Sequence, residues 1–140
     1  MKLITPQRAK DLNKHFVDTR STALDEIVEK ESGKPNEKDA ISSWFSLDEL
    51  KEYIAFVEAE GKLKNITING LRVYFGAYSK NENKPEKKNL STVFFVPTQS
   101  KKGSMQKDSL GGGDGGSDIE DIDGLNTGGL GFPPSAEYPQ

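Results

Sequence analysis

Apolar residues recur every three or four positions through the first part of the chain, a spacing that places them on one face of a helix. The stripe consists of Ala9, Leu12, Phe16, Ala23, Leu24, Ile27 and Val28. Thr5 suits an N-cap and Pro6 the first helical position, because the N–H that proline lacks has no partner there. Gly33 and Pro35 supply a stop signal. The pattern predicts a first helix that begins at Pro6 and ends near Ser32.

A second apolar stripe follows a well-marked start. Ser46 and Glu49 have the spacing of a capping box, in which each side chain bonds the main-chain N–H of the other residue. Phe45 and Leu50 flank this box as a hydrophobic staple. The stripe consists of Leu47, Leu50, Tyr53, Ile54 and Val57. The pattern predicts a second amphipathic helix that begins after Ser46 and ends at Gly61.

The middle of the chain changes to residues that favour strands. Residues 66–78 and 91–98 are rich in β-branched and aromatic types. A solvated, lysine-rich loop over 79–90 separates them. The two runs predict an antiparallel hairpin with a long tip, and Pro97 places the end of the second run at a sheet edge.

Alternation divides the first run into two faces. The odd positions Leu71, Val73, Phe75 and Ala77 form an apolar face, and the even positions Arg72, Tyr74, Gly76 and Tyr78 form an amphipathic one. Asn69-Gly70 is either a two-residue hairpin turn or a bulge within one strand. The bulge is favoured, because the first arm of a hairpin would be very short.

Glycine and acidic residues dominate the end of the chain. Between Gly111 and Gly131, 9 of 21 residues are glycine, and ordering such a stretch costs more entropy than its few apolar residues offset. The fold class predicted is α+β: two amphipathic helices packed on a small antiparallel sheet. The sequence predicts a single domain over 1–98 and a Gly-rich acidic tail over 99–140, partly docked or disordered. Local docking would use Ile119, Ile122, Leu125 or Phe132-Pro133-Pro134.

The sheet needs more than this hairpin. Two strands alone are marginally stable, so we expect a third from residues 66–68, from the tail or from a second chain. Val93, Phe94, Phe95 and Val96 also give the run 91–98 bulky apolar side chains on both faces. An edge strand of this kind must be covered, and we expect the tail or a homodimer to do so rather than a different protein.

Charge is distributed unevenly along the chain. Residues 1–60 hold 9 basic and 13 acidic side chains, residues 61–107 hold 10 and 2, and residues 108–140 hold none and 7. A glycine-rich acidic tail can fold back on the basic segment before it. We expect residues 114–123 to lie near Lys84, Lys87, Lys88, Lys101 and Lys102 and to mask them; a solvated tail is the equal alternative.

The composition argues against catalysis. The chain has no Cys and one His, so thiol nucleophiles, zinc–thiolate sites and Fe–S clusters are excluded. His15 fits a surface histidine, and no serine lies in a nucleophile elbow. The acidic run 114–123 leaves weak calcium binding open, but it does not complete an EF-hand loop. We therefore predict no enzyme activity, no catalytic residue, no cofactor and no metal.

Two groups of residues are candidates for binding. Trp44-Phe45 lies beside the second helix start, where it is either an anchor for a protein partner or a lid on the core. Arg72, Tyr74 and Tyr78 lie on one strand face near a loop that carries Lys84, Lys87 and Lys88. Aromatic and basic side chains of this kind can bind nucleic acid, although the strand does not fit the RNA-recognition motif.

Four motifs together resemble a group of short, uncharacterised bacterial proteins. They are WFSLDELKEYI (44–54), GLRVYFGAY (70–78), TVFFVPT (92–98) and LNTGGLGFPP (125–134). The resemblance covers roughly residues 41–134 and implies a bacterial cytoplasmic setting, with no particular activity.

These observations predict a small, non-enzymatic interaction protein that acts through protein–protein contacts, with a protein partner or a second copy of itself. The alternative is an anion- or nucleic-acid-binding module that uses the basic segment 61–107. No apolar run is long enough to span a membrane. The lack of Cys fits the cytosol, and with the setting that the resemblance implies we expect a cytoplasmic protein.

Overall fold

The computed structural model describes residues 1–100, 116–131 and 133–140. The chain forms two compact units. Unit 1 comprises Met1–Trp44, Gly76–Thr92 and Gly129–Gln140, and unit 2 comprises Phe45–Phe75 and Val93–Gly128. Residues beyond 98 contribute to both units. The core of each unit therefore includes residues from the segment 99–140, which was predicted to be a tail.

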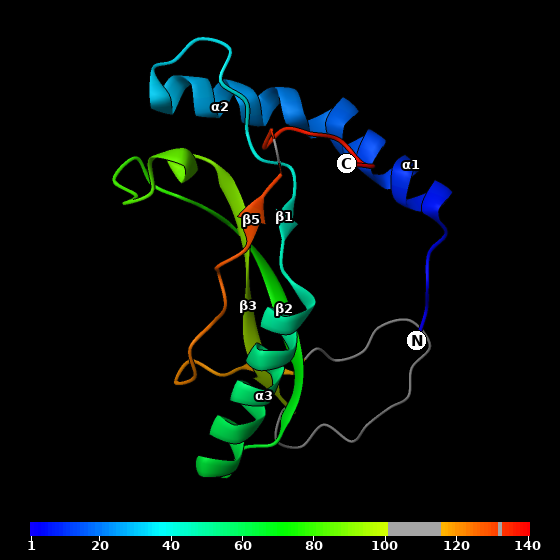
Figure 1. Cartoon of the computed structure of the whole chain (residues 1–140), viewed down its shortest axis with the longest axis vertical. Helices are drawn as coiled ribbons and strands as arrows, with labels where there is room; N and C mark the ends of the chain where they lie inside the picture. Colours follow the sequence, from blue (N-terminus) through cyan, green and yellow to red (C-terminus); the bar gives the residue numbers. More distant parts are fainter. Residues whose placement is uncertain (101–115, 132) are drawn as a thin grey trace. The chain divides into compact units, whose positions relative to one another are not determined.

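Unit 1 begins with a long helical run that Figure 1 shows in blue and cyan. It consists of α1 (Pro6–Phe16), a π-helical segment (Val17–Ser21) and α2 (Thr22–Ser32). The Thr5 side chain accepts from the N–H of Arg8 at 3.1 Å, and Gly33 ends the run in the left-handed region with φ of 70°. The predicted start and stop of the first helix are both confirmed.

The predicted apolar stripe of this helix is only partly buried. Val28 is the one buried residue of α1 and α2, whereas Leu12 and Ile27 are about half exposed. A π-helical turn holds more residues than an α-helical turn, so the segment between α1 and α2 shifts the phase of the stripe. Val28 packs with Ala40, Leu90 and Leu130 in the core of unit 1.

Shorter elements complete unit 1. They are β1 (Ser43–Trp44), a 3-10 turn (Pro85–Lys87) and β5 (Gly129–Leu130). Strand β1 pairs antiparallel with β5, with Ser43 opposite Leu130 and Trp44 opposite Gly129. The end of the chain also binds this unit: the N–H of Ile41 donates to the carbonyl of Pro134 at 3.1 Å.

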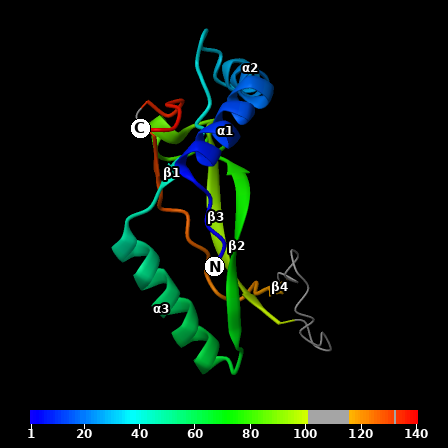
Figure 2. The same cartoon turned by 90° about the vertical axis from the view of Figure 1, so that its right-hand side faces the viewer.

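Unit 2 packs α3 (Leu47–Leu63) against a sheet (Figure 2). The sheet has three strands in the order β2-β3-β4, formed by Ile68–Ala77, Ser91–Gln99 and Ser117–Asp118; β2 and β3 each begin or end with a few residues of unit 1. The third strand thus comes from the acidic tail. The tail was one of the three sources expected for this strand, beside residues 66–68 and a second chain. The α+β class is confirmed.

Helix α3 begins as predicted but ends later. The hydroxyl of Ser46 accepts from the N–H of Glu49 at 3.0 Å, as expected of the cap. Gly61 was expected to end the helix, and that is wrong: it lies inside the helix and is buried. A Cβ at Gly61 would come 2.8 Å from the carbonyl oxygen of Ile66. Glycine is therefore required there for close packing.

The core of unit 2 joins the helix, the sheet and the tail. Tyr53, Val57, Ile119 and Ile122 are buried together, and Ile66, Ile68, Leu71, Phe95 and Leu125 pack around them. The docking expected of Ile119 and Ile122 is therefore observed; Phe132 lies outside the described residues. Two residues expected on the buried stripe of α3 are not buried: Leu47 is largely exposed, and Ile54 is somewhat less than half exposed.

Candidate interaction surface

Strand β3 is the central strand of its sheet, so the prediction that 91–98 forms an edge is wrong. Its outer side pairs with the tail through main-chain bonds. Phe95 and Leu125 exchange two, at 2.9 and 3.0 Å, and the N–H of Ile119 donates to the carbonyl of Pro97 at 3.0 Å. This contact uses only the carbonyl of Pro97, which explains why proline is tolerated inside the sheet.

Strand β2 lies at the end of the strand order, and its outer edge carries no further strand in the described part of the chain. Asn69-Gly70 lies within this one strand, so the hairpin-turn alternative is wrong. The run 66–78 therefore supplies a single edge strand.

The direction of the main-chain N–H and C=O groups alternates along a strand, and this alternation shows which residues of β2 direct those groups away from β3. Residues 95 and 97 of β3 direct their main-chain groups at the tail, so residues 94, 96 and 98 direct theirs at β2. Tyr74 stacks on Phe94 with ring centroids 5.5 Å apart, which pairs even positions with even positions. The odd positions of β2 therefore direct their N–H and C=O groups away from β3.

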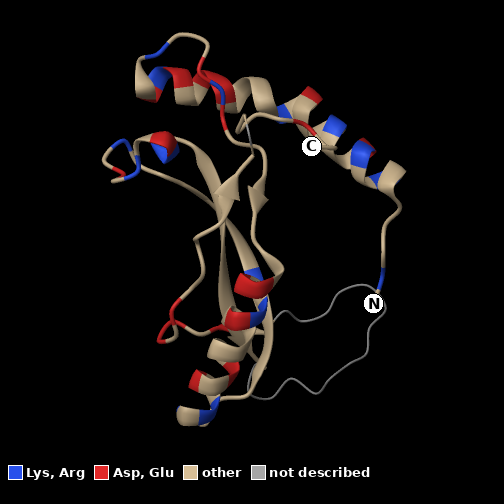
Figure 3. Ribbon diagram, in the orientation of Figure 1, with Lys and Arg blue, Asp and Glu red and all other residues tan. Residues whose placement is uncertain are grey.

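These outward positions also carry the most exposed apolar side chains of the strand. Phe75 is 91 % exposed and Val73 is 50 % exposed. Leu71 differs, because it packs against the core of unit 2. Figure 3 shows that charges gather on helices and loops, while the strands are almost wholly uncharged. The outer part of β2 thus combines open main-chain groups, apolar side chains and little charge.

The even face of β2 is occupied by the tail. The guanidinium of Arg72 donates to a carboxylate oxygen of Asp118 at 2.5 Å and to the carbonyl of Gly116 at 2.9 Å. The Tyr74 hydroxyl donates to the other carboxylate oxygen of Asp118. An acidic side chain of the chain itself therefore binds two of the residues considered for nucleic acid.

The other basic candidates belong to unit 1. Lys87 Nζ lies 3.4 Å from the Tyr78 hydroxyl and 5.3 Å from the centre of its ring. Lys84 is exposed, whereas Lys88 is half-buried. The structure brings Tyr78 and Lys87 together in one unit, and Arg72 and Tyr74 together in the other.

The acidic tail contacts basic residues other than those expected. Asp121 forms an ion pair of 3.3 Å with Lys64, in addition to the contact of Asp118 with Arg72. Lys101 and Lys102 lie outside the described residues. That the acidic tail masks Lys84, Lys87 and Lys88 stays a prediction.

Trp44 and Phe45 have different environments. Trp44 is largely exposed on β1 of unit 1. Phe45 belongs to unit 2, where its ring lies edge-on to Phe95 with centroids 5.1 Å apart. Gly128 approaches the Phe45 ring so closely that a Cβ would come within 2.6 Å of it. Phe45 is thus part of a packed layer, and Trp44 alone is accessible as an anchor.

One buried carboxylate was not anticipated. Asp39 is 1 % exposed, and its carboxylate accepts from the N–H of Ala40 at 2.8 Å, the N–H of Ser91 at 2.6 Å and the Ser91 hydroxyl. Its own N–H donates to Asp25 at 2.8 Å. These bonds use the carboxylate oxygens to join two segments of unit 1, a structural role. The partner is 52 residues away, which no local pattern signals.

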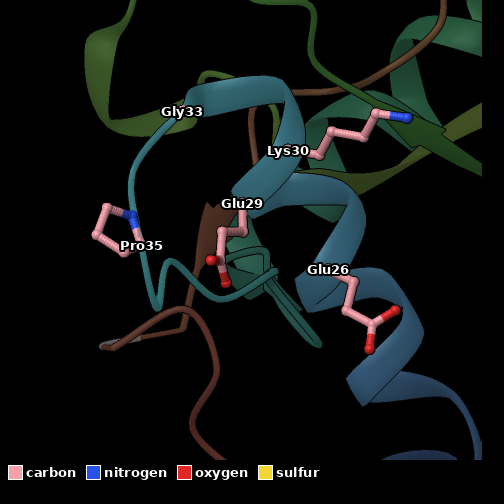
Figure 4. A pocket seen from close by; sticks show the side chains of 5 residues that line it. All are labelled: Glu26, Glu29, Lys30, Gly33 and Pro35. Carbon is pink, nitrogen blue, oxygen red and sulfur yellow. The ribbon is translucent and has the colours of Figure 1, made fainter.

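A shallow pocket of about 460 Å³ lies at the end of α2, lined by Glu26, Glu29, Lys30, Gly33 and Pro35. Figure 4 shows the side chains of Glu26, Glu29 and Lys30 pointing in different directions. Paired acid–base chemistry needs groups that converge on one substrate position. This arrangement does not provide them.

The described residues hold no group of three or more His, Asp or Glu side chains placed to bind a metal ion. In the same part of the chain, every helix is too short or too polar to cross a lipid bilayer. Comparisons with protein-family models, with curated proteins and with solved structures give no match.

Proposed function

We propose that this chain is a non-enzymatic interaction protein that binds another polypeptide along the outer edge of β2, in a cytoplasmic setting. One observation carries the proposal: a strand of ten residues lies at a sheet edge with a nearly fully exposed Phe75 on it. An extended polypeptide satisfies such an edge through main-chain hydrogen bonds, while its side chains pack against the exposed apolar ones.

The character of this edge supports binding rather than protection. Natural edge strands are commonly blunted by proline, by lysine or by short length. Strand β2 has none of these features, since its one charged residue is Arg72. Arg72 lies at an even position, and the Asp118 carboxylate accepts from its guanidinium. The edge positions 71, 73, 75 and 77 are all apolar.

Binding of an anion or a nucleic acid is the less favoured function. Arg72 and Tyr74 would have to exchange Asp118 for the ligand. A phosphate ligand would also lie beside an acidic segment, and that repulsion opposes its approach.

The experiment is site-specific photocrosslinking of the full chain in its native host. A photoreactive residue is placed at position 75 in one variant and at position 63 in the control, because Leu63 is also strongly exposed but lies at the end of α3. We expect a discrete crosslinked protein from position 75 and none from position 63. Equal, diffuse crosslinking from both positions would contradict the proposal.

A further inference from the structure

Building on the proposed function, we infer that the polypeptide bound along β2 is a second copy of this chain, with the two β2 strands paired antiparallel about a two-fold axis. The apolar pattern of the strand is the first argument. When the pair is centred on Tyr74, Val73 lies opposite Phe75 of the partner subunit, and Leu71 lies opposite Ala77 of the partner subunit. All four apolar positions of the odd face then meet apolar positions, as favourable cross-strand pairs require.

The main chain fits the same register. The odd positions of β2 direct their N–H and C=O groups outward, as shown by the alternation along the sheet. In an antiparallel pair, residues that point at each other exchange both hydrogen bonds. The register centred on Tyr74 pairs odd positions with odd positions, so the outward groups of each strand meet those of the other.

Charge supports this register as well. Arg72 is the one charged residue of β2, and directly opposed like charges destabilise a strand pair. In the register centred on Tyr74, Arg72 lies opposite Gly76 of the partner subunit. The two arginines therefore do not oppose each other, and each retains Asp118 of its own subunit, 2.5 Å away.

The covered edge explains why the assembly would stop at two copies. The tail pairs with the outer side of β3. Its strand β4, at the other end of the sheet, has only two residues, so β2 is the one long open edge of the described sheet. Two strands paired by a two-fold axis use both open edges at once, which closes the assembly. The product is a sheet of six strands in the order β4-β3-β2-β2-β3-β4, with a tail strand at each end.

The experiment measures the dimer dissociation constant of the purified full chain by analytical ultracentrifugation. We expect a concentration-dependent dimer, and Phe75→Lys should raise the dissociation constant on the order of tenfold or more by opposing the new charges to apolar residues. Leu63→Lys is the matched control, because it places the same charge on a similarly exposed position outside β2. It should leave the constant unchanged.

A second variant tests the register itself. In the double variant Val73→Glu with Phe75→Lys, each new carboxylate lies opposite a new ammonium of the partner subunit if the pair is centred on Tyr74. We expect the dimer to recover relative to Phe75→Lys alone, with the recovery lost in high salt. Circular dichroism of each variant checks that it is folded. Failure of the double variant to recover while it remains folded would overturn the register.

Two further outcomes separate this inference from the proposed function. A wild-type chain that is monomeric at every concentration, with a crosslink from position 75 to a protein of different mass, would overturn the second copy and keep the interaction function. A monomer without any specific crosslink from position 75 would overturn both.

Discussion

The two outer sides of the β2–β3 pair in unit 2 differ sharply. The outer side of β3 is covered by the tail, through the Phe95–Leu125 bridge and the pairing of Thr98 with Asp118. The outer side of β2 exposes Phe75. A sheet edge is a template for further pairing unless it is covered. The chain thus covers one side with its own tail and leaves the other open in the described residues, and the proposed interaction function rests on this contrast.

The covering segment is unusual in composition. It is acidic and rich in glycine, yet Ile119 and Ile122 are as deeply buried as the core residues of α3. Gly116 shows why glycine is needed at the start of this segment: its φ is 65°, and a Cβ there would clash with the carbonyl oxygen of Gln99. Buried anchors, main-chain bonds to β3 and this close approach hold the segment on the sheet.

The largest expected effect comes from removing an anchor of the covered edge. Ile122→Ala leaves a cavity beside Tyr53 and Val57, and we expect a loss of about 2–5 kcal/mol in the free energy of unfolding. Urea denaturation measures it. Ile54→Ala removes the same atoms from an exposed position on α3 and should cost less than about 1 kcal/mol. Equal losses in the two variants would show that the tail anchor adds nothing to the core.

The next effect separates the open edge from the fold. Val73→Pro removes an N–H that points away from β3, so we expect the ladder to β3 to survive while the dimer dissociation constant rises on the order of tenfold. Tyr74→Pro is the control on the same strand: it removes an N–H directed at β3 and should destabilise the fold itself, on the order of 2–3 kcal/mol.

Thermal unfolding and sedimentation distinguish the two proline variants. If Val73→Pro unfolds at the same temperature as Tyr74→Pro, the assignment of outward positions on β2 is wrong. If Val73→Pro is stable and still dimeric, the edge is not the dimer interface.

A smaller effect concerns the hydroxyl that ties the tail to the sheet. Tyr53 Oη donates to the carbonyls of Asp123 at 3.0 Å and Phe95 at 3.3 Å. Burial, and then the Asp123 carboxylate, raise the pKa of Tyr53 above its ordinary value of 10.0. The folded state therefore disfavours the phenolate. Its contribution to stability is complete below the ordinary pKa and is lost as the pH rises through the folded one.

Tyr53→Phe tests this account of the covered edge. We expect a loss of about 1 kcal/mol at neutral pH, because the two carbonyls lose a donor. Above pH 10 the difference from the wild type should shrink, since phenylalanine cannot ionise. Urea denaturation across this pH range measures it, with the exposed Tyr138→Phe as control. A difference that stays constant with pH would contradict the ionisation argument.

The features that sequence predicts here are those with local signals. Thr5 and Gly33 mark the ends of the first helical run, and Ser46 marks the start of α3, because caps act within one turn. The π-helical segment has no such signal, so the predicted stripe of the first helix lost its phase after Phe16. Gly61 matches a stop signal locally, yet it serves a packing contact with Ile66 and Ile68.

The candidate surface was harder to predict, because strand order is not local. Both hairpin strands are rich in apolar residues, and Pro97 led to the wrong prediction that 91–98 would lie at the edge. The tail that covers β3 is anchored by Ile119 and Ile122. These two residues are isolated in a polar, glycine-rich run, so no helical or strand periodicity marks them in the sequence. The Arg72–Asp118 pair likewise joins residues 46 positions apart. Charge blocks indicated attraction between the segments but not the partners.

The smallest expected effect is that of releasing Arg72 from the tail. Asp118→Asn keeps the size of the side chain but removes its charge, and the side chains of Arg72 and Asp118 are about one-third exposed. We expect a stability loss of at most about 1 kcal/mol that fades with salt, as for other solvent-accessible pairs. If the tail masks an anion site, binding of a single-stranded oligonucleotide should rise slightly at low salt and lose the gain at moderate salt.

Glu120→Gln is the control that gives this last measurement its meaning. It changes the net charge by the same amount at an exposed position of the same segment, so general attraction to a polyanion rises equally in both variants. Deleting the whole tail would not serve, because it would also remove Ile119 and Ile122 from the core. A larger gain for Asp118→Asn than for Glu120→Gln assigns the effect to Arg72 and supports masking. Equal gains would reduce the role of Asp118 to holding the tail on the covered edge, which leaves the open edge of β2 as the proposed binding surface.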